Sequence, residues 1–139
     1  MTAETKRSDP GRTMGIKTIL IIDDDAALRD IYSTALARGG YDTLAAADGQ
    51  DGLDLAKNRC PDLILLDVMM PDKDGLEVLE ELKSDLNTRD IPVVMLTNIV
   101  QEEEHRRCRE MGVTKYLVKT GVDPNDLVRE AQDIVGPAA

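Results

Sequence analysis

The chain has 139 residues, 42% hydrophobic and 32% charged, which suits one domain with a substantial core better than two. Its formal net charge of −10 would repel phosphate backbones and anionic lipids, so direct binding to nucleic acid or membrane is not expected. No apolar stretch approaches the ~20 residues of a membrane span. The N-terminus also lacks the apolar centre of a secretory signal, and we expect a cytoplasmic protein.

The side chains available for a core or a metal site are restricted. There are three Tyr and neither Phe nor Trp, so the core must be aliphatic. Cys60 and Cys108 are the only cysteines and His105 is the only histidine, without the spacing of a metal site. We therefore expect two reduced thiols and neither a zinc site nor a thiol-based one.

The first residues differ in composition from the rest. Residues 1–15 are polar, contain Pro and Gly and show no periodicity, which is typical of a flexible tail. We expect a single folded domain over residues 16–139.

Short apolar runs then alternate five times with amphipathic runs. The apolar runs predict buried strands at Lys17–Ile22, Tyr41–Ala46, Asp62–Leu66, Pro92–Leu96 and Lys115–Val118. The amphipathic runs predict helices at Ala26–Arg38, from Asp48 or Gly49 to Lys57, from Asp74-Gly75 onward, around Glu102–Met111 and at Pro124–Val135. Apolar strands alternating with helices indicate an α/β fold whose parallel sheet is covered on both faces.

Details of two helices can be predicted as well. In the first, one stripe is expected to be buried, made of Leu28, Ile31, Tyr32, Ala35 and Leu36. Asp25 precedes it, and we interpret that side chain as a helix cap rather than a third metal ligand. The fourth helix carries Glu102 to Glu104 among several arginines, which predicts a solvated helix with i,i+3 and i,i+4 ion pairs. A partner-binding surface is the alternative there.

Polar side chains follow four of the predicted strands. Asp23, Asp24 and Asp25 follow the first, Asp67 the third, Thr97 and Asn98 the fourth, and Lys119 and Thr120 the fifth. In parallel sheets of this kind, ligands bind beyond the carboxyl ends of the strands, at the switch point of strand order. We therefore expect carboxylates, a hydroxyl and an ammonium group at one edge.

Together, these groups suit metal binding and phosphoryl transfer. Crowded carboxylates repel each other unless protons or a cation compensate. Mg²⁺ prefers carboxylate and phosphate oxygens. A carboxylate beside Mg²⁺ can attack a phosphoryl group to form an acyl phosphate, while the metal and a lysine neutralise the transferring oxygens.

The motifs Asp23-Asp24, Leu66 to Gly75 (LDVMMPDKDG), Met95-Leu96-Thr97 and Tyr116 to Lys119 (YLVK) resemble the receiver domain of two-component response regulators. The match covers roughly residues 17–136, with the motifs in order at fitting intervals. The resemblance implies the flavodoxin-like strand order 2-1-3-4-5. It also implies that a histidine kinase or phosphotransfer protein is the partner that supplies the phosphoryl group.

The resemblance also implies residue roles. Asp67 is expected to be the phosphoacceptor, and the metal ligands are expected to be Asp24, Asp67, the Met69 backbone carbonyl and, mainly through water, Asp23. Lys119 would pair with the phosphoryl group. Thr97 would be the switch hydroxyl, coupled to the orientation of Tyr116.

Four positions depart from the family pattern. Thr120 stands where the family usually has a proline joined by a cis bond, which puts the placement of Lys119 in question. Asn98 is larger than the small residue often found after the switch threonine. Met69 and Ile99, two positions beyond Asp67 and Thr97, are apolar and predict slow loss of the phosphoryl group.

The leading functional hypothesis is a stand-alone receiver, similar to chemotaxis regulators, that changes its binding to a downstream protein or to itself through its last two β–α units. The alternatives are a receiver fragment of a longer regulator, an interaction module that works without phosphorylation, and a Mg²⁺-dependent phosphohydrolase. The last usually needs a second acid where Met69 stands, so we expect a phosphoacceptor rather than an enzyme.

Overall fold

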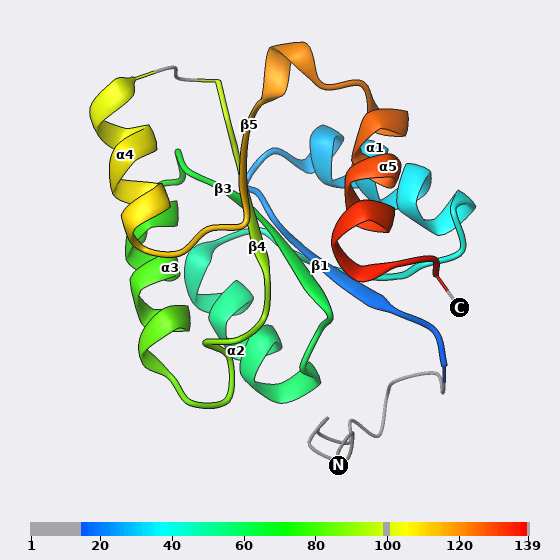
Figure 1. Ribbon diagram of the computed structural model, residues 1–139, viewed down its shortest axis with the longest axis horizontal. Helices are drawn as coiled ribbons and strands as arrows, with labels where there is room; N and C mark the ends of the chain where they lie inside the picture. The colour runs from blue at the N-terminus through cyan, green and yellow to red at the C-terminus, as the bar shows by residue number, and fades with distance from the viewer. Residues whose placement is uncertain (1–14, 99–100, 139) are drawn as a thin grey trace.

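The fold is a five-stranded parallel sheet with helices on both faces, seen in a computed structural model that describes residues 15–98 and 101–138 (Figure 1). The strand order is β2-β1-β3-β4-β5. The strands are β1 (Thr18–Ile22), β2 (Asp42–Ala46), β3 (Leu63–Asp67), β4 (Val93–Thr97) and β5 (Lys115–Val118). The predicted flavodoxin-like order is confirmed. The expected tail at 1–15 and Ile99 lie outside the described residues, except for Gly15.

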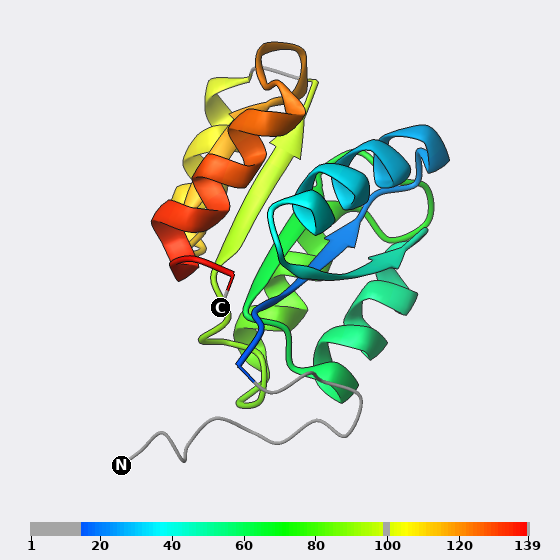
Figure 2. The same cartoon turned by 90° about the vertical axis from the view of Figure 1, so that its right-hand side faces the viewer.

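Among the described residues, four α-helices connect the strands, and a 3₁₀ turn leads from β5 to a fifth helix. They are α1 (Ala26–Arg38), α2 (Gly49–Arg59), α3 (Gly75–Ser84), α4 (Glu102–Glu110), the turn η2 (Lys119–Gly121) and α5 (Pro124–Val135). Helices α2, α3 and α4 lie on one side of the sheet and α1 and α5 on the other (Figures 1 and 2). In the described part of the chain, no helix is both long and apolar enough to cross a membrane.

Each face of the sheet buries its own aliphatic cluster. On the side of α2, α3 and α4, strand residues such as Leu20 and Leu66 pack with Leu53, Leu79 and Cys108. On the other side, Ile19 and Leu65 pack with the helix residues Tyr32, Leu36 and Leu127. Such alternation along β1 and β3 explains why these strands are apolar throughout. Cys60 and Cys108 are buried and no disulfide joins them, as predicted.

Helix α1 differs in one respect from its predicted stripe. Tyr32 and Leu36 are buried, whereas Ile31 is 46% exposed. The prediction for Ile31 was wrong, because this side chain faces a surface hollow between α1 and the start of α5 that is also lined by Asp123 and Pro124. Asp25 is the N-cap of α1, as predicted, and its carboxylate accepts hydrogen bonds from the N–H groups of Ala27 and Leu28.

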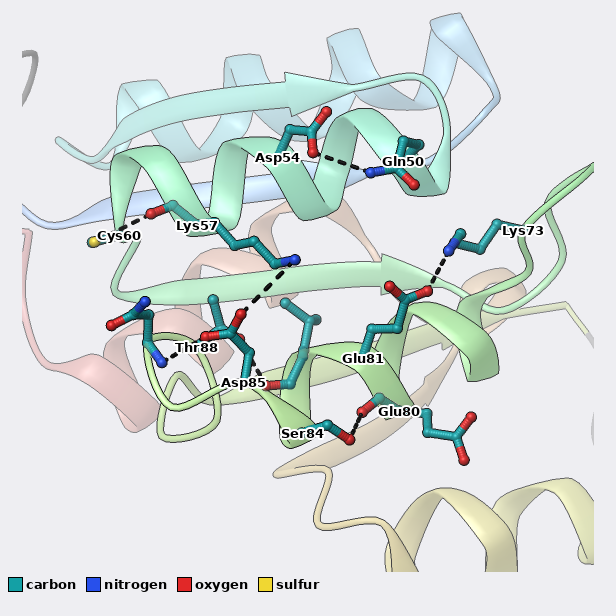
Figure 3. Close-up of polar contacts among 12 residues, drawn as sticks. Gln50, Asp54, Lys57, Cys60, Lys73, Glu80, Glu81, Ser84, Asp85 and Thr88 are labelled. Atoms are coloured by element: carbon teal, nitrogen blue, oxygen red, sulfur yellow. Dashed lines mark hydrogen bonds and ion pairs between the residues drawn. The ribbon is translucent and has the colours of Figure 1, made fainter.

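Polar contacts hold the loop between α3 and β4 (Figure 3). The Thr88 hydroxyl is buried and donates to the Leu82 carbonyl at 2.7 Å. Asp85 accepts from the N–H of Asn87 and lies 3.8 Å from the Lys57 ammonium of α2. These contacts are at the amino ends of the strands, on the edge of the sheet opposite the carboxyl ends.

Gly75 allows α3 to begin directly against the end of β3. Its N–H donates to the Val68 carbonyl at 2.9 Å. A Cβ atom at this position would lie 2.3 Å from the Asp67 carbonyl oxygen and 2.7 Å from the Val68 Cα. Both neighbours are backbone atoms, which have no rotamer with which to move away. A side chain here would therefore push α3 away from Asp67.

We expect Gly75→Ala to destabilise the fold by about 3 kcal/mol or more, because the added methyl overpacks a site that can relax only through the backbone. Gly121→Ala is the matched control, since a Cβ there meets nothing within 4 Å. Its unfolding free energy should stay within about 0.5 kcal/mol of the parent value. Urea unfolding of both variants measures the difference, and equal midpoints would contradict the close approach at Gly75.

Candidate functional site

The strand register brings the predicted polar residues to one edge. Ile22 is paired with Leu66, so the next residues, Asp23 and Asp67, lie side by side. Thr97 on β4 is paired with Val118 on β5, directly before Lys119. The carboxyl ends of β1, β3, β4 and β5 therefore present two acids, a hydroxyl and an ammonium group in a row.

Three carboxylates form the acidic part of this site. Oxygen atoms of Asp23, Asp24 and Asp67 all lie within 4.8 Å of one another. Asp23 and Asp67 are buried and Asp24 is exposed. Asp23 is held from two sides, since its carboxylate accepts from the Asp25 N–H at 2.9 Å and its carbonyl accepts from the Arg29 guanidinium at 2.8 Å. Such a set of hard oxygen donors, one open to solvent, suits a Mg²⁺ ion that keeps some of its water.

Lys119 is the cation of the site. Its ammonium lies 2.7 Å from Asp23 Oδ2 and 3.4 Å from Asp67 Oδ2, and its side chain is only 8% exposed. Burial works against the charged form, but the hydrogen bond that Lys119 donates to Asp23 and the charge of Asp67 raise the pKa of Lys119 above its usual value. Lys119 therefore stays charged between the two buried acids.

The pKa of the Asp67 carboxyl group departs from its usual value. Burial, followed by the charge of Asp23, raises the pKa of Asp67 to about 7, against the opposing effects of Lys119 and of the Met69 N–H. That N–H donates to Asp67 Oδ1 at 3.2 Å. The repulsion between the Asp23 and Asp67 carboxylates costs free energy, and a bound divalent cation would offset that cost. The residues present therefore fit Mg²⁺.

The entrance is a surface cavity lined by Asp24, Asp67, Met69, Asn98 and Lys119, together with Asp25 and Leu28. The Met69 side chain is 55% exposed, and Asn98 is exposed. Both side chains therefore lie at the opening of the cavity that leads to Asp67.

Thr97 and Tyr116 connect the site to α4. Thr97 is fully buried. Its side chain hydrogen-bonds the Tyr116 phenol, which also donates to the Glu104 carboxylate at 3.1 Å. The half-buried ring of Tyr116 stacks on His105, with ring centroids 4.4 Å apart.

The structure brings together the predicted set of Asp23, Asp24, Asp67, Thr97 and Lys119, with Tyr116 one hydrogen bond away. Thr120 lies in the turn η2, the described peptide bonds are all trans, and Lys119 still reaches both acids.

Sequence reasoning did not find Arg29, Glu104 or His105. Their contacts join a loop to a helix and a helix to a strand, and no local pattern in the sequence marks them.

Comparison with known proteins agrees with this geometry. Residues 19–132 match the profile of the response regulator receiver domain. The chemotaxis protein CheY4 of Vibrio cholerae has a similar structure, with a TM-score of 0.81 and 29% identity, over 86% of this chain and 99% of that one. A CheY-like receiver domain protein of Methanospirillum hungatei has a TM-score of 0.80 and 30% identity, over 86% and 93%.

Two curated relatives of different length are similar to this chain. The phosphate regulon regulator PhoB of Pseudomonas aeruginosa is 39% identical over 119 residues, 86% of this chain and 52% of PhoB. This chain thus spans about half the length of that relative. The polar-differentiation regulator DivK of Brucella ovis is 34% identical over 103 residues, 74% of this chain and 84% of DivK. Strand order, matched profile and relatives agree, and the chain belongs to the response regulator receiver domain family.

Proposed function

We propose that this chain is a phosphorylation-dependent signalling switch that accepts a phosphoryl group on Asp67 from a histidine kinase or phosphotransfer protein. The observation that carries the proposal is the buried Asp67 carboxylate, close to Asp23 and Asp24 and in contact with Lys119. Because such donors act inside the cell, we propose a cytoplasmic location.

In the transfer step, an Asp67 carboxylate oxygen forms a bond to phosphorus while the bond from phosphorus to the donor nitrogen breaks. The donor nitrogen keeps the electron pair of the broken bond. Lys119, 3.4 Å from Asp67 Oδ2, lies where it can neutralise negative charge on the phosphoryl oxygens. The carboxylates of Asp23, Asp24 and Asp67 and the Met69 carbonyl would hold Mg²⁺. Bound Mg²⁺ supplies further charge neutralisation and orients the phosphoryl group.

The switch step concerns the Thr97 hydroxyl, which has a single proton to donate. To donate it to a phosphoryl oxygen on Asp67, Thr97 must give up its present acceptor. The hydrogen bond between Thr97 and Tyr116 would then change, and with it the position of Tyr116 against α4. The surface of α4, β5 and α5 is therefore the proposed binding face for a downstream protein or a second copy of this chain.

We expect incubation with acetyl phosphate and Mg²⁺ to add one phosphoryl group, detected by intact-protein mass. Asp67→Asn should abolish the addition, because an amide oxygen is a poor nucleophile. Asp25→Asn is the matched control, since it removes the same charge two residues from Asp23 while Asn keeps the helix cap. The proposal fails if Asp67→Asn is still modified, or if both variants lose the modification equally.

Mg²⁺ affinity should fall when a carboxylate of the site is removed and rise when the ammonium group is removed. Asp24→Asn should weaken Mg²⁺ binding about tenfold, because it removes a carboxylate ligand. Lys119→Met should strengthen it by a similar factor, because it removes the ammonium that now compensates Asp23 and Asp67. Isothermal titration calorimetry of the full chain measures both. If the Mg²⁺ affinity changed in the same direction in both variants, the proposed roles of Asp24 and Lys119 would be wrong.

The apolar Met69 at the entrance should make the aspartyl phosphate long-lived. We expect Met69→Asn to speed phosphoryl loss about three- to tenfold, because an amide can hold the attacking water. Met69→Leu, which keeps an apolar side chain, should leave the rate unchanged. The rates are read from intact mass after removal of the phosphodonor. Equal lifetimes in the two variants would show that Met69 does not control access of water.

A further inference from the structure

Tyr116 is bound to α4 by two neighbouring residues of that helix. Its hydroxyl donates to Glu104 Oε1 at 3.1 Å, and its ring stacks on the His105 ring with an interplanar angle of 19°. Glu104 and His105 are half-buried, whereas the adjacent Glu103 is exposed and forms an ion pair with Arg106. The two contacts thus come from the side of α4 that faces β5.

Few other contacts fix this helix. Cys108 is the one buried residue of α4, all of whose residues are described. The preceding residue, Gln101, forms no side-chain capping hydrogen bond among the described residues. The other paired charges of α4, Arg106 with Glu103 and with Glu110, lie within the helix and do not attach it to the sheet. The contacts with Tyr116 are therefore a substantial part of what holds α4 in place.

We propose that Glu104 and His105 are positioning residues that hold Tyr116 in its present orientation and so oppose the phosphorylated state. The inference rests on the proposed function, because it concerns the threonine–tyrosine coupling of that switch. It goes further in assigning the opposing restraint to two residues of α4.

The energetics follow from the connected hydrogen bonds. A hydrogen bond to an ionised carboxylate is stronger than one between neutral groups. Burial and the neighbouring Glu104 raise the pKa of Tyr116 to about 12, so the phenol keeps the proton that it donates. As long as Glu104 and His105 hold the phenol, its oxygen stays beside the Thr97 hydroxyl. Loss of the restraint lowers the cost of turning Thr97 toward a phosphoryl oxygen, and by linkage raises affinity for the phosphoryl group.

The tyrosines of the chain allow a direct test. The full chain labelled with 3-fluorotyrosine gives three ¹⁹F resonances, from Tyr32, Tyr41 and Tyr116. Tyr32 is buried, and besides burial the charges of Lys119, Asp23 and Asp67 act on its pKa, so we expect its resonance to report occupancy of the site. Tyr41 donates to the Gly136 carbonyl and serves as a folding reference. Tyr116→Phe assigns the third resonance. Beryllofluoride with Mg²⁺ is the probe, as a tetrahedral stand-in for a phosphoryl group on a carboxylate.

In the parent chain, beryllofluoride should shift the resonances of both Tyr32 and Tyr116. In the double variant Glu104→Ala/His105→Ala, the Tyr116 resonance should move toward its beryllofluoride position before any addition. The affinity for beryllofluoride should rise about tenfold. His105→Phe, which keeps a stacked ring, and Glu103→Ala, which loses only the pair with Arg106, should behave like the parent.

The outcomes separate this inference from the proposed function. If the parent Tyr32 resonance does not respond to beryllofluoride and Mg²⁺, the proposed function fails. If Tyr32 responds but the double variant keeps the parent affinity and Tyr116 position, with Tyr41 unchanged, the restraint by Glu104 and His105 is wrong while the switch stands. A variant with a displaced Tyr41 resonance is replaced by Glu104→Gln, which weakens the hydrogen bond and keeps the shape. Its affinity should also exceed that of the parent.

Discussion

The contact of Lys119 with two buried acids is the interaction on which the rest of the site depends. Removing charges from water is costly, and a buried pair is tolerated only where the partners are close and well bonded. Asp23 and Asp67 meet that condition through Lys119, yet with Asp24 they place three carboxylates against one ammonium. In the folded chain, the negative charge of the three carboxylates is therefore only partly neutralised. The remaining negative charge favours binding of a small divalent cation.

The same charge balance explains why the site is built on strand ends rather than on a long loop. A rigid sheet can hold carboxylates together against their repulsion, because each strand is fixed by its ladder and by packing on both faces. Gly75 contributes by letting α3 start against the Asp67 backbone. Helix α4, by contrast, is highly charged and buries little. The molecule thus combines a stiff site with one weakly attached element, as expected where a local event must change a distant surface.

Much of the fold could be predicted because its signals are local. The carboxyl ends of parallel strands must meet at one edge, so Asp23, Asp67, Thr97 and Lys119 could be grouped without coordinates. Four of the predicted strands began one residue early and ended at or one residue before the observed end. Asp62, just before β3, contacts β1 through its side chain, which accepts the Thr18 N–H, and through its own N–H, which donates to the Thr18 carbonyl.

What could not be predicted depends on contacts between distant elements. The apolar spacing of α1 suggested a buried Ile31, but burial depends on how α5 crosses that helix. Thr120 left the placement of Lys119 open, since only the complete loop shows that the ammonium reaches both acids. In the sequence, Glu104 and His105 do not differ from the other polar residues of this helix, and only the position of β5 beside them shows their contacts with Tyr116.

The two ends of the described fold also lie together. The Lys17 N–H donates to the Ala138 carbonyl at 2.8 Å, and the Tyr41 hydroxyl to the Gly136 carbonyl at 2.7 Å. Both contacts are at the amino ends of the strands, opposite Asp67. A short peptide could therefore join these two ends of the described fold into a ring, which could be opened at another loop on that same edge, away from the acidic site. The order of the elements along the chain can thus be permuted while the acidic edge stays intact.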